Sequence, residues 1–458
     1  MSEKSSRERL ESRLGFILIS AGCAIGIGNV WKFPYLAGQN GGGIFVLIYL
    51  FFLAILGVPV MTMEFSMGRA SRKSPVYLYR KIAPEGSKWN LHGFICMAGN
   101  YILMMFYTTV AGWMLKYFVS MAKGDFELLD KEGVTSLFTG MLGSPLIQVG
   151  YMAVVVIVGF FINSLGLQKG LEKVSKWMMS SLLIIMVILA ANSIFMKGSA
   201  EGLSFYLLPD VAKASRIGWS KVIVSAMNQA FFTLSIGMGS MAIFGSYIGN
   251  ERSLMGESIH IGLLDTFVAI VSGLIIFPAC FTYEVQPDSG PSLIFITLPN
   301  IFNNMPLGRV WGSLFFVFMS FAAFSTVFAV FENIIACTMD ITGRNRKEAS
   351  IINCIVVLVL SLPCALGFNI LSFIEPMGKG TSFLDLEDFL VSNLILPIGS
   401  FIFVIFCISK RGWGWENFVT EANKGKGIKV KPWMRGYMTY ILPVIVMAFI
   451  LLGLFYKG

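Results

Sequence analysis

Charged residues are scarce in this sequence. Asp, Glu, Lys and Arg together make up 13% of its 458 residues, whereas a soluble globular domain carries roughly 25%. Hydrophobic residues make up 55%, and the mean hydropathy is +0.73. So few charges cannot cover a water-exposed surface, which excludes a soluble globular protein and indicates one embedded in a lipid bilayer.

The side chains from which catalytic and metal sites are built are scarce as well. There are two histidines, His92 and His260, and seven cysteines without a Cys-x-x-Cys motif. A membrane enzyme would need a nucleophile–base pair or a metal cluster, and the sequence offers neither pattern. It therefore argues against an enzyme, and we interpret the cysteines as small hydrophobic residues.

Long apolar runs fill most of the chain. The N-terminal sequence MSEKSSRERLESR lacks the cleavable segment of a signal peptide, so we expect the first apolar run to be retained. A helix needs about 20 apolar residues to cross a bilayer. Eleven runs are long enough, at residues 14–36, 42–69, 90–122, 146–164, 175–196, 219–248, 257–282, 309–341, 350–368, 383–409 and 435–456. We therefore expect an all-α polytopic membrane protein.

The basic residues predict its orientation. Most of the 35 lysines and arginines fall in segments that share one side of the membrane with the N-terminus. By the positive-inside rule this side is cytoplasmic, and the odd number of spans places the C-terminus outside the cell membrane. The net charge of +9 then reflects topology and contact with anionic lipids rather than nucleic-acid binding.

The first apolar run contains residues that weaken a helix. Its motif AIGIGN at 24–29 returns as SIGMGS at 235–240 in the sixth run. Five crossings separate the two motifs, so the second copy enters the membrane from the opposite side. Interrupted helices at corresponding places in two halves of a chain indicate a transporter site at the interface of inverted repeats.

The physical reason lies in the free backbone groups. A half-helix N-terminus attracts a carboxylate and a half-helix C-terminus attracts a cation, so two breaks can hold an amino acid together with sodium. Glycines also form packing faces, and Gly22 and Gly26 have that spacing, but two matching breaks with side-chain oxygens favour a site.

A channel would need a continuous polar pore, whereas the polar groups within the apolar runs cluster around the two breaks. The nearer alternative is a proton-coupled amino-acid permease of the same architecture.

Two stretches resemble the neurotransmitter:sodium symporter family, namely GIGNVWKFPYLAGQNGGGIF at 26–45 and VPVMTMEFSMGR at 58–69. The resemblance implies sodium-driven alternating access by ten core helices in a 5+5 inverted repeat, with helices 1 and 6 unwound. It divides the chain into a cytoplasmic segment 1–13, a first repeat 14–196, an inverted second repeat 219–409, a cytoplasmic loop 410–434 and an accessory helix 435–456.

The resemblance also implies two sodium sites. The first comprises the substrate carboxylate with the Ala24 carbonyl, Asn29, Thr233 and Asp265. The second comprises the carbonyls of Gly22, Ile25 and Ala322 and the hydroxyls of Ser325 and Thr326. Such hard oxygen ligands suit sodium, and a lone acid in an apolar span is expected to be functional.

Asp265 also bears on chloride. Chloride-dependent relatives have a neutral Asn at this position and a Ser where this chain has Ala269. The fixed carboxylate can replace chloride as the compensating negative charge, so we expect chloride-independent transport. Tyr49 and Gln229, however, match other members of the chloride environment.

For the substrate, the resemblance implies a hydrophobic L-amino acid, aliphatic or aromatic. Monoamine-transporting relatives place an aspartate where this chain has Gly26, and glycine suits a substrate that brings its own carboxylate. Met238 replaces an aromatic residue, and a flexible thioether adapts to side chains of several shapes. The implied substrate residues are Cys23, Ala24, Gly26, Gly28, Leu103, Tyr107, Phe232, Thr233, Ser235, Met238, Thr326 and Val330.

Two gates follow from the same resemblance. Lys32 and Asp388 match the extracellular ionic gate, and Arg7, Tyr247 and Asp340 match the cytoplasmic gate. We further expect Glu64 to hydrogen-bond the unwound sixth helix. Glu332, in the eighth span, receives no role beyond a polar contact in the core.

Overall fold

The computed structural model describes residues 8–283 and 292–455. Its first part is formed by α1 (Arg13–Ala24), η1 (Gly28–Lys32), α2 (Phe33–Gln39), α3 (Gly43–Phe52), η2 (Leu53–Gly57), α4 (Val58–Ser71), α5 (Pro75–Ile82), α6 (Asn90–Lys123), α7 (Lys131–Gly143), α8 (Pro145–Ser164), η3 (Leu167–Glu172) and α9 (Lys173–Ile194). The η elements are π-helical turns, most of which continue directly into a neighbouring α-helix.

The rest of the described chain consists of helices of the same kinds. It is formed by α10 (Ser199–Leu207), α11 (Val211–Ile217), α12 (Trp219–Thr233), α13 (Ser240–Gly245), α14 (Leu254–Thr282), η4 (Leu293–Thr297), α15 (Leu298–Asn303), α16 (Gly308–Thr342), α17 (Arg346–Leu366), α18 (Phe383–Phe389), η5 (Leu390–Ile395), α19 (Leu396–Ile408), α20 (Trp415–Ala422), α21 (Met434–Gly436), η6 (Tyr437–Ile441) and α22 (Leu442–Phe455).

The membrane-crossing helices agree with the sequence prediction. Within the described residues, nine helical stretches are long and apolar enough to cross a bilayer, and the pair Arg13–Ala24 and Gly28–Gln39, bent by 55°, makes a tenth. The remaining predicted crossing, 219–248, is divided between α12 and α13. The expected breaks in the first and sixth spans are therefore present.

Two boundaries differ from the prediction. The fifth crossing begins at Leu167 rather than at residue 175, because η3 runs without interruption into α9. The segment 410–434, expected to be a loop, contains the short helix α20, whose Phe418 is fully buried.

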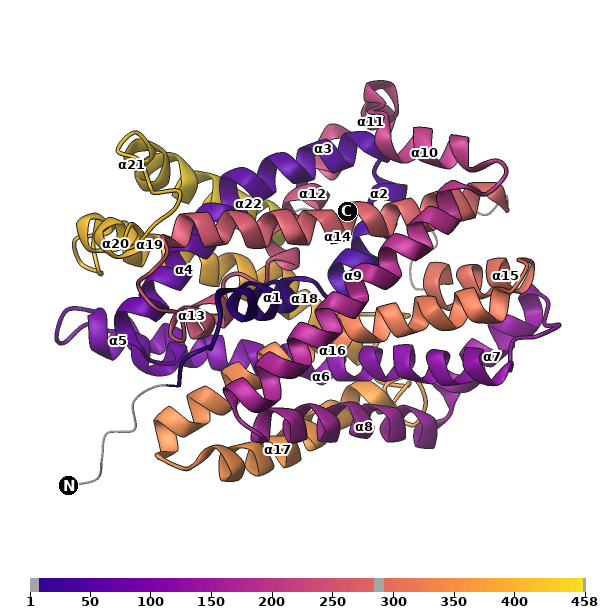
Figure 1. Ribbon diagram of the computed structural model, residues 1–458, viewed down its shortest axis with the longest axis horizontal. Coiled ribbons are helices and arrows are strands. Elements are labelled where there is room, and N and C mark those ends of the chain that lie inside the picture. Colours follow the sequence, from indigo (N-terminus) through magenta and orange to yellow (C-terminus); the bar gives the residue numbers. More distant parts are fainter. Residues whose placement is uncertain (1–7, 284–291, 456–458) are drawn as a thin grey trace.

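The long helices lie side by side, and short helices gather at the two ends of the molecule (Figure 1). Residues 8–12, which precede α1, lie at one end with α5 and α20, and α7, α10, α11 and α15 lie at the other. Near the centre, α1 packs against α9, α14 and α16. Because nine of the twelve residues of α1 are buried, the first break lies deep inside the protein.

Candidate functional site

The first break separates α1 from the π-helical turn η1. α1 ends at Ala24, and Ile25 follows in an extended conformation with ψ of 93°. Gly26 is required here because a Cβ atom at this position would lie 2.4 Å from both the Thr326 Oγ1 and the Tyr107 hydroxyl oxygen. The backbone of the break therefore touches two other helices directly.

The second break spans the six residues between α12 and α13. Three of them adopt left-handed conformations, with φ of 49° at Ser235, 100° at Gly237 and 73° at Gly239. Glycine adopts this conformation readily, whereas a serine does so at a cost. The Gly-x-Gly spacing thus makes this sharp change of direction possible.

Buried side chains hydrogen-bond the backbone groups that the second break leaves unpaired. Glu64 Oε1 accepts a hydrogen bond from the Gly237 N–H at 2.5 Å, which confirms the contact predicted for Glu64. The amide of Asn100 donates to the Met238 carbonyl at 3.0 Å. Without such partners, a buried unpaired backbone group would destabilise the break.

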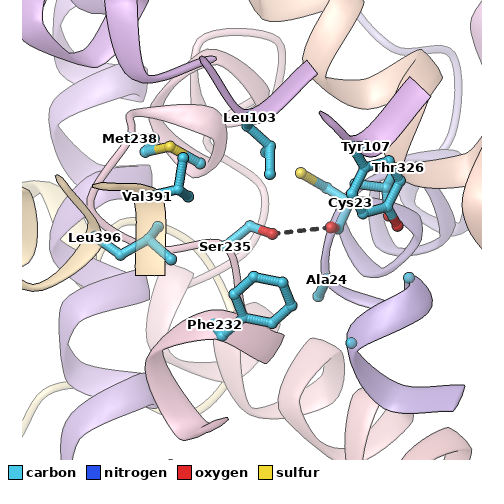
Figure 2. Close-up of a pocket in the computed structure, with 12 residues that line it drawn as sticks. Cys23, Ala24, Leu103, Tyr107, Phe232, Ser235, Met238, Thr326, Val391 and Leu396 are labelled. Carbon is cyan, nitrogen blue, oxygen red and sulfur yellow. Dashed lines mark hydrogen bonds between the residues drawn. The ribbon is translucent and has the colours of Figure 1, made fainter. Parts of the chain in front are cut away.

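The two breaks are joined to each other. The Ser235 hydroxyl donates to the Cys23 carbonyl at 3.1 Å, as the dashed line in Figure 2 shows. The Gln229 amide on α12 donates to the Gly28 carbonyl at 2.9 Å. These bonds link the two unwound segments, which are far apart in sequence, across a single site.

The second break also packs against α19, backbone to backbone. A Cβ atom on Gly399 would lie 1.9 Å from the Gly237 carbonyl oxygen, and one on Gly237 would lie 2.1 Å from the Leu396 carbonyl oxygen. Only glycine at both positions permits this approach.

A first cluster of oxygen atoms surrounds Asp265 on α14, whose side chain is fully buried. Asn29 donates to Asp265 Oδ1 at 2.8 Å, and Thr233 donates to Oδ2 at 3.0 Å. Tyr49 donates to the same Oδ2 at 3.1 Å. The structure thus brings together three of the four residues of the first predicted sodium site, and Ala24, the fourth, lines the cavity described below.

A second cluster lies between the end of α1 and the middle of α16. The Ser325 hydroxyl lies 3.0 Å from the Ile25 carbonyl oxygen and 2.8 Å from that of Ala322. The Thr326 hydroxyl lies 3.3 Å from the Gly22 carbonyl oxygen. The structure thus places the three predicted carbonyl groups of the second sodium site against the Ser325 or the Thr326 hydroxyl, and these groups present only carbonyl and hydroxyl oxygens.

A small cavity lies between the two breaks (Figure 2). Only about 20 Å³ of it admits a water-sized sphere, which is roughly the space of one water molecule. It is lined by Cys23, Ala24, Gly26, Gly28, Leu103, Tyr107, Phe232, Ser235, Met238, Thr326, Val391 and Leu396.

Ten of the twelve residues predicted to bind substrate line this cavity. The other two lie beside it, Thr233 against Asp265 and Val330 buried on α16. Two lining residues, Val391 on η5 and Leu396 on α19, were not predicted. They are ordinary apolar residues of an apolar span, so no local pattern distinguishes them from residues that face lipid.

A larger cavity of about 270 Å³ adjoins the small one and shares with it Gly28, Tyr107 and Phe232. Lys32 and Asp388 also line this vestibule, and the Lys32 Nζ lies 3.3 Å from the Asp388 carboxylate. The same Nζ lies 4.1 Å from the centre of the Phe232 ring. The pair predicted as the extracellular gate is thus formed directly above the ring that separates the two cavities.

At the other end of the molecule, two of the three predicted gate residues hydrogen-bond other elements. The Tyr247 hydroxyl donates to Glu332 Oε1 at 2.6 Å, and Asp340 Oδ2 accepts from the Ser74 N–H at 2.8 Å. Arg7, the third predicted gate residue, lies outside the described residues.

Glu332 has a larger role here than the sequence indicated. Its buried carboxylate forms an ion pair with Arg346 at 2.6 Å, and Arg346 also pairs with Glu8 of the N-terminal segment at 3.1 Å. The sequence signal for this ion pair is an acid within an apolar span, followed 14 residues later, after a tight turn, by an arginine. This network fastens the N-terminal segment over the end of the helical core.

Comparison with known proteins identifies the family to which a chain with these features belongs. The profile of the "Sodium:neurotransmitter symporter family" matches residues 7–127 and 134–457. The chain belongs to the sodium:neurotransmitter symporter family. It is therefore a multi-pass membrane protein of a sodium-coupled transporter family, and the predicted absence of an enzymatic function agrees with this membership.

Individual members of the sodium:neurotransmitter symporter family are similar over most of the chain. An uncharacterised sodium-dependent transporter of Bacillus subtilis, YhdH, is 34% identical over 86% of this chain and 86% of its own length. An uncharacterised sodium-dependent transporter of Haemophilus influenzae is 28% identical over 99% of this chain and 100% of its own length. The crystal structure of MhsT in complex with L-phenylalanine has a TM-score of 0.88 and 33% identity, covering 98% of this chain and 100% of MhsT. The motifs at 26–45 and 58–69 also suggest a similarity to MhsT, and the structural match agrees with it.

Proposed function

We propose that this chain is a symporter that imports hydrophobic L-amino acids, both aliphatic and aromatic, together with two sodium ions by alternating access. The observation that carries this proposal is the cavity between the two breaks. One side of it is made of backbone at half-helix ends and the hydroxyls of Tyr107 and Ser235, and the other side is apolar. This division matches a zwitterion with a hydrophobic side chain.

The charges around the cavity favour an amino acid over a simple amine. No acidic residue is among those that line it within the described chain, so an amine would find no counter-charge. An amino acid brings its own carboxylate, for which backbone N–H groups at the first break and the Tyr107 hydroxyl are suitable donors. The Ile27 N–H already donates to the Tyr107 hydroxyl oxygen at 3.0 Å, which holds both groups at the cavity. In MhsT, which shares the fold, the bound molecule is L-phenylalanine.

Flexible side chains around the cavity support a broad substrate range. Met238 and Leu103 line it beside the aromatic rings of Tyr107 and Phe232. The thioether and the isobutyl group have rotatable bonds and can repack around substrate side chains of different shape.

The two oxygen clusters suit sodium because hard cations prefer carbonyl, hydroxyl and carboxylate oxygens. We assign the cluster at Asp265 and the cluster at Ser325 and Thr326 to one ion each. Because Asp265 places a negative charge directly against Tyr49, where chloride-dependent relatives hold chloride, we propose that transport needs no chloride.

We also retain the predicted orientation in the cell membrane, with the N-terminus inside. In support, the basic segments around α5 and α20 lie at the same end of the molecule as residues 8–12 (Figure 1). Under this orientation the Lys32–Asp388 vestibule opens to the outside.

Uptake into proteoliposomes tests the proposal. Labelled leucine and tryptophan are offered under a sodium gradient, under a choline gradient and under a proton gradient, all without chloride. We expect sodium-driven uptake of both amino acids. Uptake driven by protons alone would instead identify a proton-coupled permease of the same architecture, and a strict need for chloride would contradict the assignment of Asp265.

Replacing Lys32 by Gln is expected to have a modest effect. The Lys32 and Asp388 side chains are 29% and 35% exposed, and an ion pair in such surroundings contributes up to about 1 kcal/mol. Labelled leucine bound to Lys32→Gln should therefore dissociate about threefold to fivefold faster, with little loss of maximal uptake. The exposed Lys131 at the start of α7 gives the matched control Lys131→Gln. A complete loss of uptake in Lys32→Gln would show that this pair does more than slow dissociation.

A further inference from the structure

Glu387 on α18 is an acid to which neither the sequence motifs nor the proposed site gives a role. It precedes the gate residue Asp388 directly, yet the two side chains differ in their surroundings. The Asp388 side chain lines the vestibule and is 35% exposed. Glu387 is only 3% exposed.

Few polar groups surround the Glu387 carboxyl. Neither of its oxygens has an N–H or O–H donor among the described residues, and the hydroxyl of Thr109 on α6 has no such partner either. The Cys364 thiol on α17, a weak donor, is within hydrogen-bonding reach of both Glu387 and Thr109. These three residues form a small polar cluster between α18, α6 and α17, in which the acid lacks a strong donor from the described protein.

A charged carboxylate is very costly in such a place. Burying an ion without a partner costs far more than burying a neutral group, and such an acid takes up a proton instead. A metal cation is a poor alternative occupant, because one carboxylate, one hydroxyl and one thiol fall far short of the roughly six to eight oxygen ligands that a hard cation such as calcium takes. A proton needs only the carboxylate.

We propose that Glu387 binds a proton whenever the extracellular gate is closed and releases it outward when the gate opens. Glu387 and Asp388 lie on the same short helix, so a movement of α18 that separates Asp388 from Lys32 also withdraws Glu387 from Thr109 and Cys364 and exposes it to water. This inference rests on the proposed function, because gate opening is a step of alternating access.

The other titratable and charged groups near Glu387 do not explain a proton that is bound while the gate is closed. Among the described residues, α6 contributes the Thr109 hydroxyl to this cluster and α17 contributes the Cys364 thiol. On α18 itself, Asp385 hydrogen-bonds Ser382 at the start of the helix, and Asp388 is paired with Lys32. Glu387 is thus the acid of α18 that is buried without an ionic partner among the described residues.

The test measures sodium-driven uptake of labelled leucine at external pH 6 to 9, with a constant internal pH. In the wild type, closing the gate requires a proton from outside, so the equilibrium constant for closing should fall by up to about tenfold per pH unit, and uptake should fall with it at high external pH. Glu387→Gln imitates the protonated form, and its uptake should change less than about twofold over the same range. Glu375→Gln, at an exposed acid in the loop before α18, should keep the wild-type profile.

A second readout needs no transport. A membrane-impermeant thiol reagent added outside reaches Cys23, which lines the central cavity, only through the open gate, and Cys23→Ser gives the background. The ratio of the labelling rate in the wild type to that in Glu387→Gln should rise with external pH, since the ratio cancels the intrinsic reactivity of the thiol.

The outcomes are distinct. A flat wild-type uptake profile, or a profile that Glu387→Gln leaves unchanged, would overturn the proposal. If Glu387→Gln folds poorly, Glu387→Leu, which also cannot ionise and suits a buried position, takes its place. If the wild type transports neither leucine nor tryptophan, the proposed function fails, while the labelling ratio still decides whether Glu387 controls the gate.

Discussion

Gly26→Ala is expected to reduce sodium-driven amino-acid uptake by about a hundredfold. The added Cβ would lie 2.4 Å from both Thr326 Oγ1 and the Tyr107 hydroxyl oxygen, so at least one of these side chains must shift. A conflict of this kind in a packed core costs about 1–3 kcal/mol, and each ~1.4 kcal/mol is tenfold in affinity. Thr326 also belongs to the second oxygen cluster, so sodium and substrate binding should weaken together.

The matched control is Gly150→Ala. Gly150 lies on the membrane-crossing helix α8, and a Cβ atom there would meet nothing within 4 Å. This variant should keep wild-type uptake and thermal stability. Uptake curves for leucine at several sodium concentrations measure both effects. Normal sodium dependence in Gly26→Ala would show that the first break is not shared by the two ligands.

Asp265→Asn is expected to abolish uptake in chloride-free solution, a loss of at least about a hundredfold. The carboxylate accepts hydrogen bonds from Asn29, Thr233 and Tyr49 and is the negative charge of the first oxygen cluster. Removing one partner from a buried charge network costs about 3–5 kcal/mol. Asparagine preserves the shape of the side chain, so the loss reports on charge rather than on packing.

Chloride distinguishes this role from a purely structural one. If the carboxylate stands in for chloride, adding chloride should restore part of the uptake of Asp265→Asn and should leave the wild type unchanged. Asp125→Asn, at an exposed acid after α6, serves as the control for the same substitution. Full activity of Asp265→Asn without chloride would remove Asp265 from the sodium site.

The sequence predicted the breaks because their cause is local. Gly26, Gly28, Gly237 and Gly239 lie within apolar runs, where glycine weakens a helix, and the structure interrupts the helices at these places. The resemblance to the symporter family implied the side chains around each break. All seven residues that the first and sixth spans supply to the cavity lining are among those it implied.

Other features depend on distant pairings that a single sequence does not reveal. Val391 and Leu396 reach the cavity only because α19 packs against the second break. The pairing of Glu332 with Arg346 depends on how α16 and α17 turn toward each other and on where Glu8 lies. The burial of Glu387 likewise follows from the way α18 faces α6 and α17, since its neighbour Asp388 has the same acidic character but lines the vestibule.

The contact between Gly237 and Gly399 has a consequence for the evolution of this protein. Neither position has room for a side chain. A Cβ on Gly399 would collide with the Gly237 carbonyl and one on Gly237 with the Leu396 carbonyl, and both obstacles are backbone rather than movable groups. A homologue cannot exchange one of them and recover by repacking. In homologues that keep this contact, both positions should be glycine. In a homologue that has another residue at one of them, the other position should have changed as well.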